Sequence, residues 1–278
     1  MTLTEPKLLT RKEIKTQVIT EPQLITVWGP AGATGKSTIA LNLSYELTLL
    51  GQRVILLDLD TSAPALNLLL PITETSAGLA GAARLIRQGR FGPEELDRLS
   101  ICIKHGRNRL RFLPGLPSAS RWAEITPDTI EQLIAVCKHN FDIIVTDVSS
   151  SIEDALTAPD SPTPRNSAGR TAIKLSTRAI VCLADSKLSV ARYLNVFSVL
   201  NELQKERVLV LNRGQNISHL ANAIRSLTKE RIDFQIPNDE PALQLAESQL
   251  LPLALARRKS PARNAIAALA HKLLAWAP

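Results

Sequence analysis

The sequence is poor in several residue types, and each shortage excludes a class of function. Aromatic residues make up 4% of the 278 residues, so a base-stacking surface for single-stranded nucleic acid is not expected. The three cysteines, Cys102, Cys137 and Cys182, are far apart in apolar surroundings, which indicates small buried side chains and neither a metal site nor a redox pair. No apolar run is long and charge-free enough to span a bilayer.

The first 21 residues mix Thr, Lys and Glu and lack the apolar core of a secretory signal. We expect residues 1–21 to be a flexible N-terminal extension and the protein to be cytoplasmic. The rest of the chain has what a sizeable core needs, because 45% of all residues are hydrophobic. The net charge of +7 favours contact with an anionic polymer or a membrane surface.

Residues 24–38, reading LITVWGPAGATGKST, are the most informative segment. An apolar run enters a loop of small residues that ends in Gly-Lys-Ser-Thr, as phosphate-binding loops do. Glycine lets backbone N–H groups approach phosphate oxygens, and the following helix points its positive end at the anion. We expect Lys36 to reach the β- and γ-phosphates and Ser37 to ligate Mg²⁺. The other nucleotide-binding residues predicted in the loop are Gly32, Ala33, Thr34 and Gly35.

Two other interpretations of the loop stay open, because Pro30 stands where the first glycine of G-x-x-x-x-G-K-[ST] would be. One is an ordinary strand-to-helix turn with a surface lysine. The other is a dinucleotide-binding turn, which uses three glycines and an acid about 20 residues later, a place that Asp58 fills. That turn belongs to an oxidoreductase that binds NAD without Mg²⁺. The pair Lys36-Ser37 favours a triphosphate with Mg²⁺.

Apolar strands alternate with helical segments along the chain, and runs such as RVILLD and DIIVTD are typical of parallel strands covered on both faces. We therefore expect an α/β fold with a single doubly wound, mostly parallel sheet and helices on both faces, over residues 22–278. Residues 158–170, rich in Pro, Ser and Gly, are predicted to be an inserted loop. Strands are expected at 23–28, 53–58, 101–105, 109–113, 142–147, 178–184, 207–211 and 233–236, and helices at about 36–50, 79–88, 93–99, 129–139, 189–204, 218–228, 242–247 and 261–275.

Aspartates follow two of the predicted strands. Asp58 and Asp60 end the strand at 53–58, and Asp147 ends the strand at 142–147. Because carboxyl ends of parallel strands meet at one edge of a sheet, we expect these side chains near the phosphate loop. Asp147 then suits a second Mg²⁺ contact, made through water. A single such aspartate is usually a helix cap or turn former, but three converging strand ends favour the functional role.

Together these segments resemble the MinD/ParA family of P-loop ATPases, whose phosphate loop is a deviant Walker A motif. The resemblance runs from Ile25 to the C-terminus and includes GPAGATGKST, QRVILLDLD, FDIIVTDVSSSIEDAL, VLVLNR and IPNDEPALQLAESQLLPL. The loop and GLPSASRW look most like an actinobacterial septum-site branch related to CpaE-like pilus-assembly ATPases. The family implies a P-loop NTPase fold, ATP and Mg²⁺ as ligands, and a nucleotide-dependent homodimer.

The resemblance also implies roles for matched positions. Lys36 would hold the β- and γ-phosphates, and Asp60 would position the attacking water, so these two are the expected catalytic residues. Ser37 and Asp147 would hold Mg²⁺, and Thr38 would bind the α-phosphate. Asn212 would bind the adenine, and Pro237, with its neighbours Ile236 and Asn238, would pack near the base. Asp58 would support a nucleotide-sensing switch. An ordinary polar strand end remains the alternative for Asn212.

One departure from the family bears on catalysis. The family's loop begins with a signature lysine that reaches across the dimer to the partner's phosphate, and Ala31 stands at that position. A cation aimed at the transferring phosphoryl group can be worth on the order of 10³–10⁵ in rate, by analogy with arginine fingers. Hydrolysis is therefore expected to be slow, to use another basic residue, or to be absent, while binding survives. Serines 149–151 also replace the family's Pro-Ala-Gly.

Three segments are candidate partner surfaces. Two basic clusters could contact DNA phosphates or be plain solvated surface. The last helix could be a membrane anchor of the MinD kind or a core-packing helix, and its alanines and few cations favour the core. The first cluster is Arg107, Arg109 and Arg111, which a strand would place on one face; the second is Arg257, Arg258, Lys259 and Arg263; the helix carries Ile266, Leu269, Leu273 and Trp276.

We expect a MinD/ParA-type switch ATPase that acts in septum placement, chromosome or plasmid partitioning, or pilus assembly, with an unknown activating or cargo protein. The membrane alternative would place it at the inner face of the plasma membrane. A non-hydrolysing nucleotide-binding scaffold is the alternative that Ala31 raises. A bacterial tyrosine autokinase also lacks the signature lysine, but it needs a C-terminal tyrosine cluster, and the tyrosines here are Tyr45 and Tyr193 alone.

Overall fold

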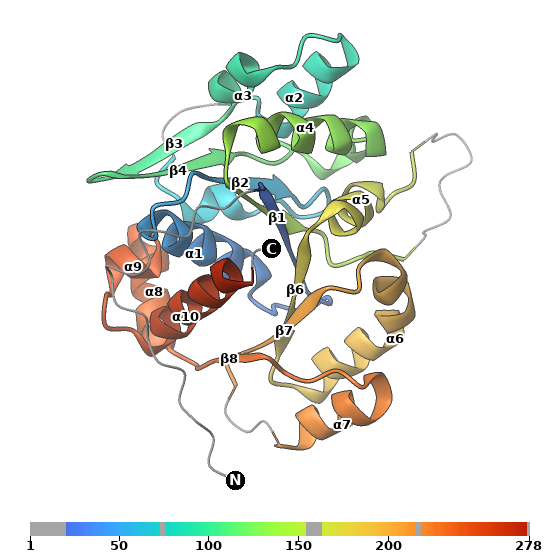
Figure 1. Cartoon of the computed structure of the whole chain (residues 1–278), viewed down its shortest axis with the longest axis vertical. Helices are drawn as coiled ribbons and strands as arrows, with labels where there is room; N and C mark the ends of the chain where they lie inside the picture. Colours follow the sequence, from blue (N-terminus) through green and yellow to red (C-terminus); the bar gives the residue numbers. More distant parts are fainter. Residues whose placement is uncertain (1–20, 73–75, 154–162, 215–217, 277–278) are drawn as a thin grey trace.

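The computed structural model describes residues 21–72, 76–153, 163–214 and 218–276. Within these ranges, eight strands form one sheet in the order β3-β4-β2-β5-β1-β6-β7-β8 (Figure 1). Neighbouring strands are parallel except β3 and β4, which form an antiparallel hairpin at one edge. The strands are β1 (Gln23–Trp28), β2 (Val54–Leu59), β3 (Ile101–His105), β4 (Asn108–Leu113), β5 (Ile143–Val148), β6 (Arg178–Ala184), β7 (Arg207–Asn212) and β8 (Phe234–Ile236).

Helices cover both faces of the sheet, so the expected doubly wound α/β fold is confirmed. On one face lie α1 (Lys36–Leu49), α8 (Glu240–Gln249), α9 (Leu253–Ala256) and α10 (Pro261–Ala275), as Figure 1 shows. On the other face lie α2 (Gly78–Arg87), α3 (Pro93–Leu99), α4 (Pro127–Asn140), α5 (Ser167–Leu175), α6 (Lys187–Leu203) and α7 (Ser218–Thr228).

Strand β1 shows why the sequence carries no alternating pattern. Its side chains point in turn to the two faces, and both faces are core. Ile25 and Val27 belong to the core under α1 and α10, while Leu24 and Trp28 belong to the core under the opposite helices. A strand covered on both sides is apolar at most positions without alternation, which is the pattern that indicated a parallel sheet.

The predicted loop at 158–170 is wrong at its C-terminal end. Residues 154–162 lie outside the described residues, but α5 already begins at Ser167. No side chain caps this helix, and its first half contains Gly169 and follows a segment rich in Pro and Ser, so the local sequence predicted a loop. Packing stabilises the helix, because Ala172 and Ile173 are fully buried in the core. The other expected strands and helices lie within two residues of their predicted bounds.

The last helix packs into the protein. Ile266, Leu269 and Leu273 of α10 are buried, and the helix lies against α1. Arg263 at its start donates from Nε and Nη2 to both carboxylate oxygens of Glu46, at 2.6 and 3.0 Å. Arg263 is therefore committed to this ion pair and not to the basic surface cluster predicted to include it. None of the described helices is both long and apolar enough to cross a membrane.

Removing the Arg263 guanidinium should destabilise the protein, because it leaves a Glu46 residue that is only 4% exposed without its partner. We expect Arg263→Ala to lower the free energy of unfolding by about 3 kcal/mol, the low end of the cost of breaking a buried ion pair. Urea unfolding followed by circular dichroism measures the loss. Adding Glu46→Gln removes the stranded charge and should restore part of the stability. A single variant as stable as the wild type would contradict this account.

Candidate functional site

The loop between β1 and α1 forms a concave surface of backbone amides. Its φ angle is positive at Gly32 (100°), Ala33 (40°) and Gly35 (82°). Backbone of this kind turns successive N–H groups toward one point, which is how anion-binding nests are made. Gly35 is the N-cap of α1, and no side chain caps the helix, so its first amides can serve an anion. The predicted phosphate-binding residues thus form one cradle.

Two neighbouring strands hold the loop in this shape. The carbonyl oxygen of Thr34 accepts hydrogen bonds from Cys182 Sγ of β6 at 3.0 Å and from Asn212 Nδ2 of β7 at 2.9 Å. Position 29 requires glycine, because a Cβ there would lie 2.5 Å from Thr34 Oγ1. Cys182 is buried, as the sequence predicted, but it also donates to the loop. Asn212, predicted to contact adenine, therefore acts on the loop as well.

The residues predicted around the base lie at the same edge of the sheet. Asn212 is the register partner of Ile236 in β8, so Pro237 follows directly beside it. Thr38 lies in the first turn of α1 and lines a pocket of about 120 Å³ with Arg213. The structure thus brings the predicted base-side residues and the phosphate loop to the carboxyl end of the sheet.

Lys36 lies between two carboxylates. Its Nζ is 2.8 Å from Asp60 Oδ2 and 3.4 Å from Asp147 Oδ1. Burial alone would lower the pKa of Lys36, but Asp147 and Asp60 outweigh it and raise that pKa. Burial likewise works against the charge of Asp60, yet Lys36 holds the pKa of Asp60 below its usual value. Both groups are therefore charged at neutral pH.

Asp147 has the properties of a metal-binding carboxylate. It is fully buried at the end of β5, and its Oδ2 has no hydrogen-bond partner among the described residues. Burial raises the pKa of Asp147, partly offset by Lys36 and by the Ser37 hydroxyl. A carboxylate and a hydroxyl beside an anion cradle are the oxygen ligands that Mg²⁺ takes together with phosphate. Ser37 and Asp147 therefore fit the predicted metal site.

Asp60 holds the turn that follows β2. Its Oδ1 accepts from the backbone N–H groups of Ser62 and Ala63, both at 2.9 Å, and from Ser149 Oγ at 2.7 Å. Ser149, two residues after Asp147, was not predicted as a site residue. Its place just past the end of an aspartate-bearing strand was the available signal. One carboxylate thus connects Lys36, the turn after β2 and the end of β5.

Asp58 lies one step behind this cluster. Its two carboxylate oxygens accept from the backbone N–H groups of Asp60 and Leu66, each at 3.2 Å. Gly115 packs against it so closely that a Cβ there would lie 2.9 Å from Asp58 Cγ. Burial, and then the charge of Asp147, raise the pKa of Asp58 to about 7. Its carboxylate faces the turn after β2, so contact with that turn is the role the geometry favours over direct nucleotide contact.

Arg165 approaches the same turn from the segment before α5 and was also missed. Its guanidinium donates to Thr61 Oγ1 at 3.2 Å and to Ser62 Oγ at 3.1 Å. It also stacks over the Trp122 ring, with 5.0 Å between guanidinium carbon and ring centroid. No sequence pattern marked it, because it follows a segment with no predicted element. The turn after β2 is thus held by side chains from the end of β2, from the residue that follows β5 and from the segment before α5.

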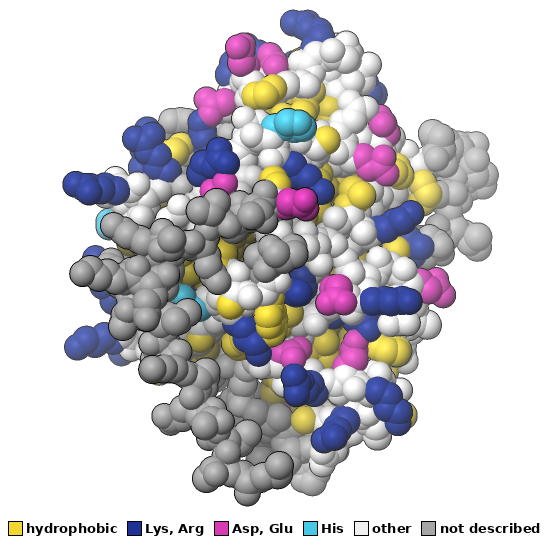
Figure 2. All heavy atoms as spheres, viewed as in Figure 1, with side chains coloured by type: hydrophobic (Ala, Val, Ile, Leu, Met, Phe, Trp, Pro, Cys, Tyr) yellow, Lys and Arg dark blue, Asp and Glu magenta, His cyan; other side chains and the backbone are white. Residues whose placement is uncertain are grey.

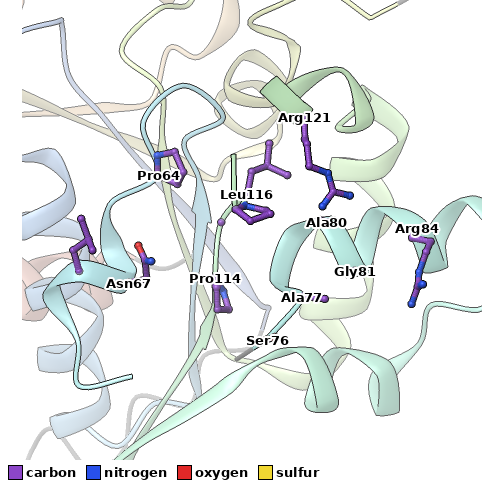
Figure 3. Close-up of a pocket in the computed structure, with 13 residues that line it drawn as sticks. Pro64, Asn67, Ser76, Ala77, Ala80, Gly81, Arg84, Pro114, Leu116 and Arg121 are labelled. Atoms are coloured by element: carbon purple, nitrogen blue, oxygen red, sulfur yellow. The ribbon is translucent and has the colours of Figure 1, made fainter. Parts of the chain in front are cut away.

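A pocket of about 510 Å³ opens beside this turn and not over Lys36. In Figure 3, Pro64 and Asn67 line one side of it, α2 lines the other, and Leu116 lies between them. Gly115, which packs on Asp58, also lines it. The pocket therefore borders the turn that Asp60 holds, which gives this turn an accessible outer surface.

A basic groove lies at the other end of the strands from the phosphate loop. It is lined by residues of the β3–β4 hairpin and by the segment that leads into β2, and its volume is about 470 Å³. Figure 2 shows Lys and Arg side chains gathered on the side of the molecule where that hairpin lies. Arg53 and Arg111 are paired with aspartates, whereas the groove's other cations form no ion pair with the described residues. The basic side chains that line the groove are Arg53, Lys104, Arg107, Arg109 and Arg111.

Comparisons with known proteins agree with this geometry. Residues 25–253 match the family model CbiA, the CobQ/CobB/MinD/ParA nucleotide binding domain. An uncharacterized ATP-binding protein of Methanocaldococcus jannaschii is 23% identical over 254 residues, 90% of this chain and 87% of that protein.

Two solved structures share the fold. A ParA family ATPase from Chlorobium tepidum has a TM-score of 0.76 and 20% identity, with 91% of this chain and 99% of that chain covered. The septum site-determining protein MinD of Pyrococcus horikoshii, complexed with Mg-ADP, has a TM-score of 0.70 and 19% identity, with 91% and 96% covered.

The pKa of Asp58 predicts that stability depends on pH. Because the folded-state value of about 7 lies above the usual 3.8, the folded protein holds a proton that the unfolded chain releases. Stability should therefore fall as the pH rises toward about 7 and level off above it. Asp58→Asn removes this titration, so urea unfolding of both proteins across this range should show the wild type losing stability relative to the variant. Parallel stability curves would contradict the prediction.

Proposed function

The chain belongs to the CobQ/CobB/MinD/ParA family of nucleotide-binding domains, and from that premise we propose that it is an ATP-hydrolysing switch of MinD/ParA type. The observation that carries the proposal is the placement of Lys36, Asp60 and Asp147 at the open side of the amide cradle. The Methanocaldococcus relative is described as ATP-binding, which favours adenine nucleotides. The Pyrococcus MinD holds Mg-ADP, which favours magnesium as the accompanying ion.

The Lys36 ammonium can pair either with the two carboxylates or with phosphate oxygens. In the structure its ammonium neutralises Asp60 and Asp147; on binding of ATP we propose that it turns to the β- and γ-phosphates, beside the amides of residues 33–37. Mg²⁺, held by Ser37 and Asp147, supplies charge neutralisation at the phosphates. Thr38 is placed for the α-phosphate, and the Asn212 side-chain oxygen is an acceptor for an adenine amino group, with Pro237 beside it.

Asp60 then becomes available as a hydrogen-bond acceptor for the attacking water. The low pKa of Asp60 keeps it ionised, and its second oxygen stays fixed by Ser149 and the turn after β2. Positioning of this kind is most of what a protein contributes to phosphoryl transfer. Because Asp60 touches both the nucleotide side and the turn, we propose that the turn changes with nucleotide state and, with it, homodimerisation and binding of an activating or cargo protein.

Two alternatives differ in how the structure bears on them. A non-hydrolysing scaffold would have the same nucleotide site without turnover. It stays the rival hypothesis, because Ala31 replaces the lysine that would assist hydrolysis. An autokinase needs accessible tyrosines, whereas Tyr45 and Tyr193 are both fully buried, so it loses support.

A membrane contact through α10 would require this helix to leave the core, so the packing favours a structural role for it.

We propose DNA as the polyanion that the basic groove contacts. Lys and Arg side chains line the groove, and such charges suit contacts with phosphates, which need no reading of base edges. Spatial organisation on the chromosome, as in partitioning, is the setting that this surface favours among septum placement, partitioning and pilus assembly.

Titration calorimetry with ATP and ADP, with and without Mg²⁺, and single-turnover hydrolysis test the nucleotide proposal. Lys36→Ala should lower ATP affinity at least about tenfold, since it removes a charge-assisted contact to phosphate. Asp60→Asn keeps a side chain of the same size and should lower the hydrolysis rate at least about 10²-fold while ATP still binds. Arg90→Ala, at an exposed position away from the site, is the control.

The outcomes separate the hypotheses. Binding without hydrolysis by the wild type would identify the scaffold. Absence of binding heat for any adenine or guanine nucleotide, with folded protein, would overturn the whole assignment.

Fluorescence anisotropy with a short random DNA duplex tests the basic groove. Combining Lys104→Glu with Arg109→Glu should weaken binding at least about tenfold and reduce the dependence of log affinity on log salt by roughly two contacts' worth. Arg90→Glu changes charge by the same sign outside the groove and should have little effect. Equal salt dependence in the wild type and the double variant would show that the groove does not bind DNA.

A further inference from the structure

An arginine lies where the family's signature lysine is missing. Arg192, on α6, donates from Nη1 to the carbonyl oxygen of Ala31 at 2.7 Å. The same nitrogen also covers Gly32, because a Cβ at that residue would lie 2.6 Å from it. We propose that Arg192 supplies, from the same chain, the cation that contacts the terminal phosphate of the nucleotide. This proposal rests on the function proposed above and adds a catalytic residue to it.

The position of Arg192 follows from how α6 is anchored. β6 lies beside β1 in the sheet, so the helix that follows β6 begins next to the phosphate loop. Val190 and Tyr193 are buried on the inner side of this first part of α6, and the Tyr193 hydroxyl donates to Glu230. The helix is therefore fixed, while the half-buried Arg192 side chain lies over the loop.

The guanidinium has donors to spare. Arginine carries five N–H groups, and among the described residues Arg192 uses one of them, on a neutral carbonyl. A phosphate oxygen is the stronger acceptor for a guanidinium, and the planar fork can hold two such oxygens. Arg165, another guanidinium next to the site, is different, because Thr61 and Ser62 already engage it. Arg192 can therefore exchange its present neutral partner for a phosphate.

A cation from the same chain changes what a dimer has to contribute. In the family, the signature lysine reaches the partner's phosphate, so the charge arrives only with the second copy. Here the charge is already attached to the loop that binds the phosphates. Dimerisation can then still follow nucleotide binding, but the cation at the terminal phosphate does not depend on it.

The test compares the wild type with Arg192→Ala, Arg192→Lys and the control Arg90→Ala. Titration calorimetry should show that Arg192→Ala weakens ATP binding about tenfold and leaves ADP binding nearly unchanged, because the contact is to the terminal phosphate. Single-turnover hydrolysis should fall at least about 10²-fold in Arg192→Ala and recover partly in Arg192→Lys. Thermal unfolding of each variant shows whether it is folded.

A mixing experiment tests whether the cation comes from the same chain. Adding excess Asp60→Asn protein supplies Arg192 without the water-positioning carboxylate. We expect no recovery of hydrolysis by Arg192→Ala, and recovery would overturn the same-chain assignment.

Failure of this proposal and failure of the proposed function look different. If the wild type binds no nucleotide, the function itself is wrong. If the wild type binds ATP, and Arg192→Ala has the same ATP-to-ADP affinity ratio and the same turnover, then Arg192 alone is wrongly assigned. If the wild type binds ATP without hydrolysing it, the ratio of ATP to ADP affinity alone tests the role of Arg192: an unchanged ratio in Arg192→Ala overturns the proposal, and a lowered one supports it.

Discussion

The charge balance around the partly buried ammonium of Lys36 is the interaction on which the site depends. Lys36 lies at the edge of the sheet between Asp60 and Asp147, two carboxylates that burial would otherwise oppose. In such surroundings an uncompensated charge is costly, so a change at any one of the three groups must be answered by the others. The proposed triphosphate would bring further negative charge next to these carboxylates, and Lys36 is the cation that would then change partners.

The second carboxylate oxygen of Asp60 connects this charge cluster to the turn after β2. It is fixed by two backbone amides of the following turn and by Ser149, while Arg165 holds the same turn through hydroxyl groups. The turn is therefore held by a set of polar contacts. Segments held in this way can exchange one set of hydrogen bonds for another without disturbing the core beneath them.

How much was visible in the sequence depended on what kind of interaction placed each residue. The phosphate loop, the strand-end aspartates and the sheet could be predicted, because backbone geometry and the convergence of parallel strands decide them. The start of helix α5 could not, since no side chain caps it and the residues before it are rich in Pro and Ser, while its stability comes from tertiary packing. Arg165 and Arg192 could not either, because both reach the site from segments distant in sequence, and only the folded chain shows which arginines do so.

Helix α1 joins two separate regions of the molecule. It starts at Lys36 in the phosphate loop, and at its other end Thr48 and Gly51 line the basic groove. Its 14 residues make a rod about 21 Å long, clamped to α10 by Glu46. A rod that stays intact cannot tilt at one end alone. The phosphate loop and the basic groove are therefore joined by one rigid helix, which the Glu46–Arg263 ion pair fixes to α10 in its last turn, at the groove end.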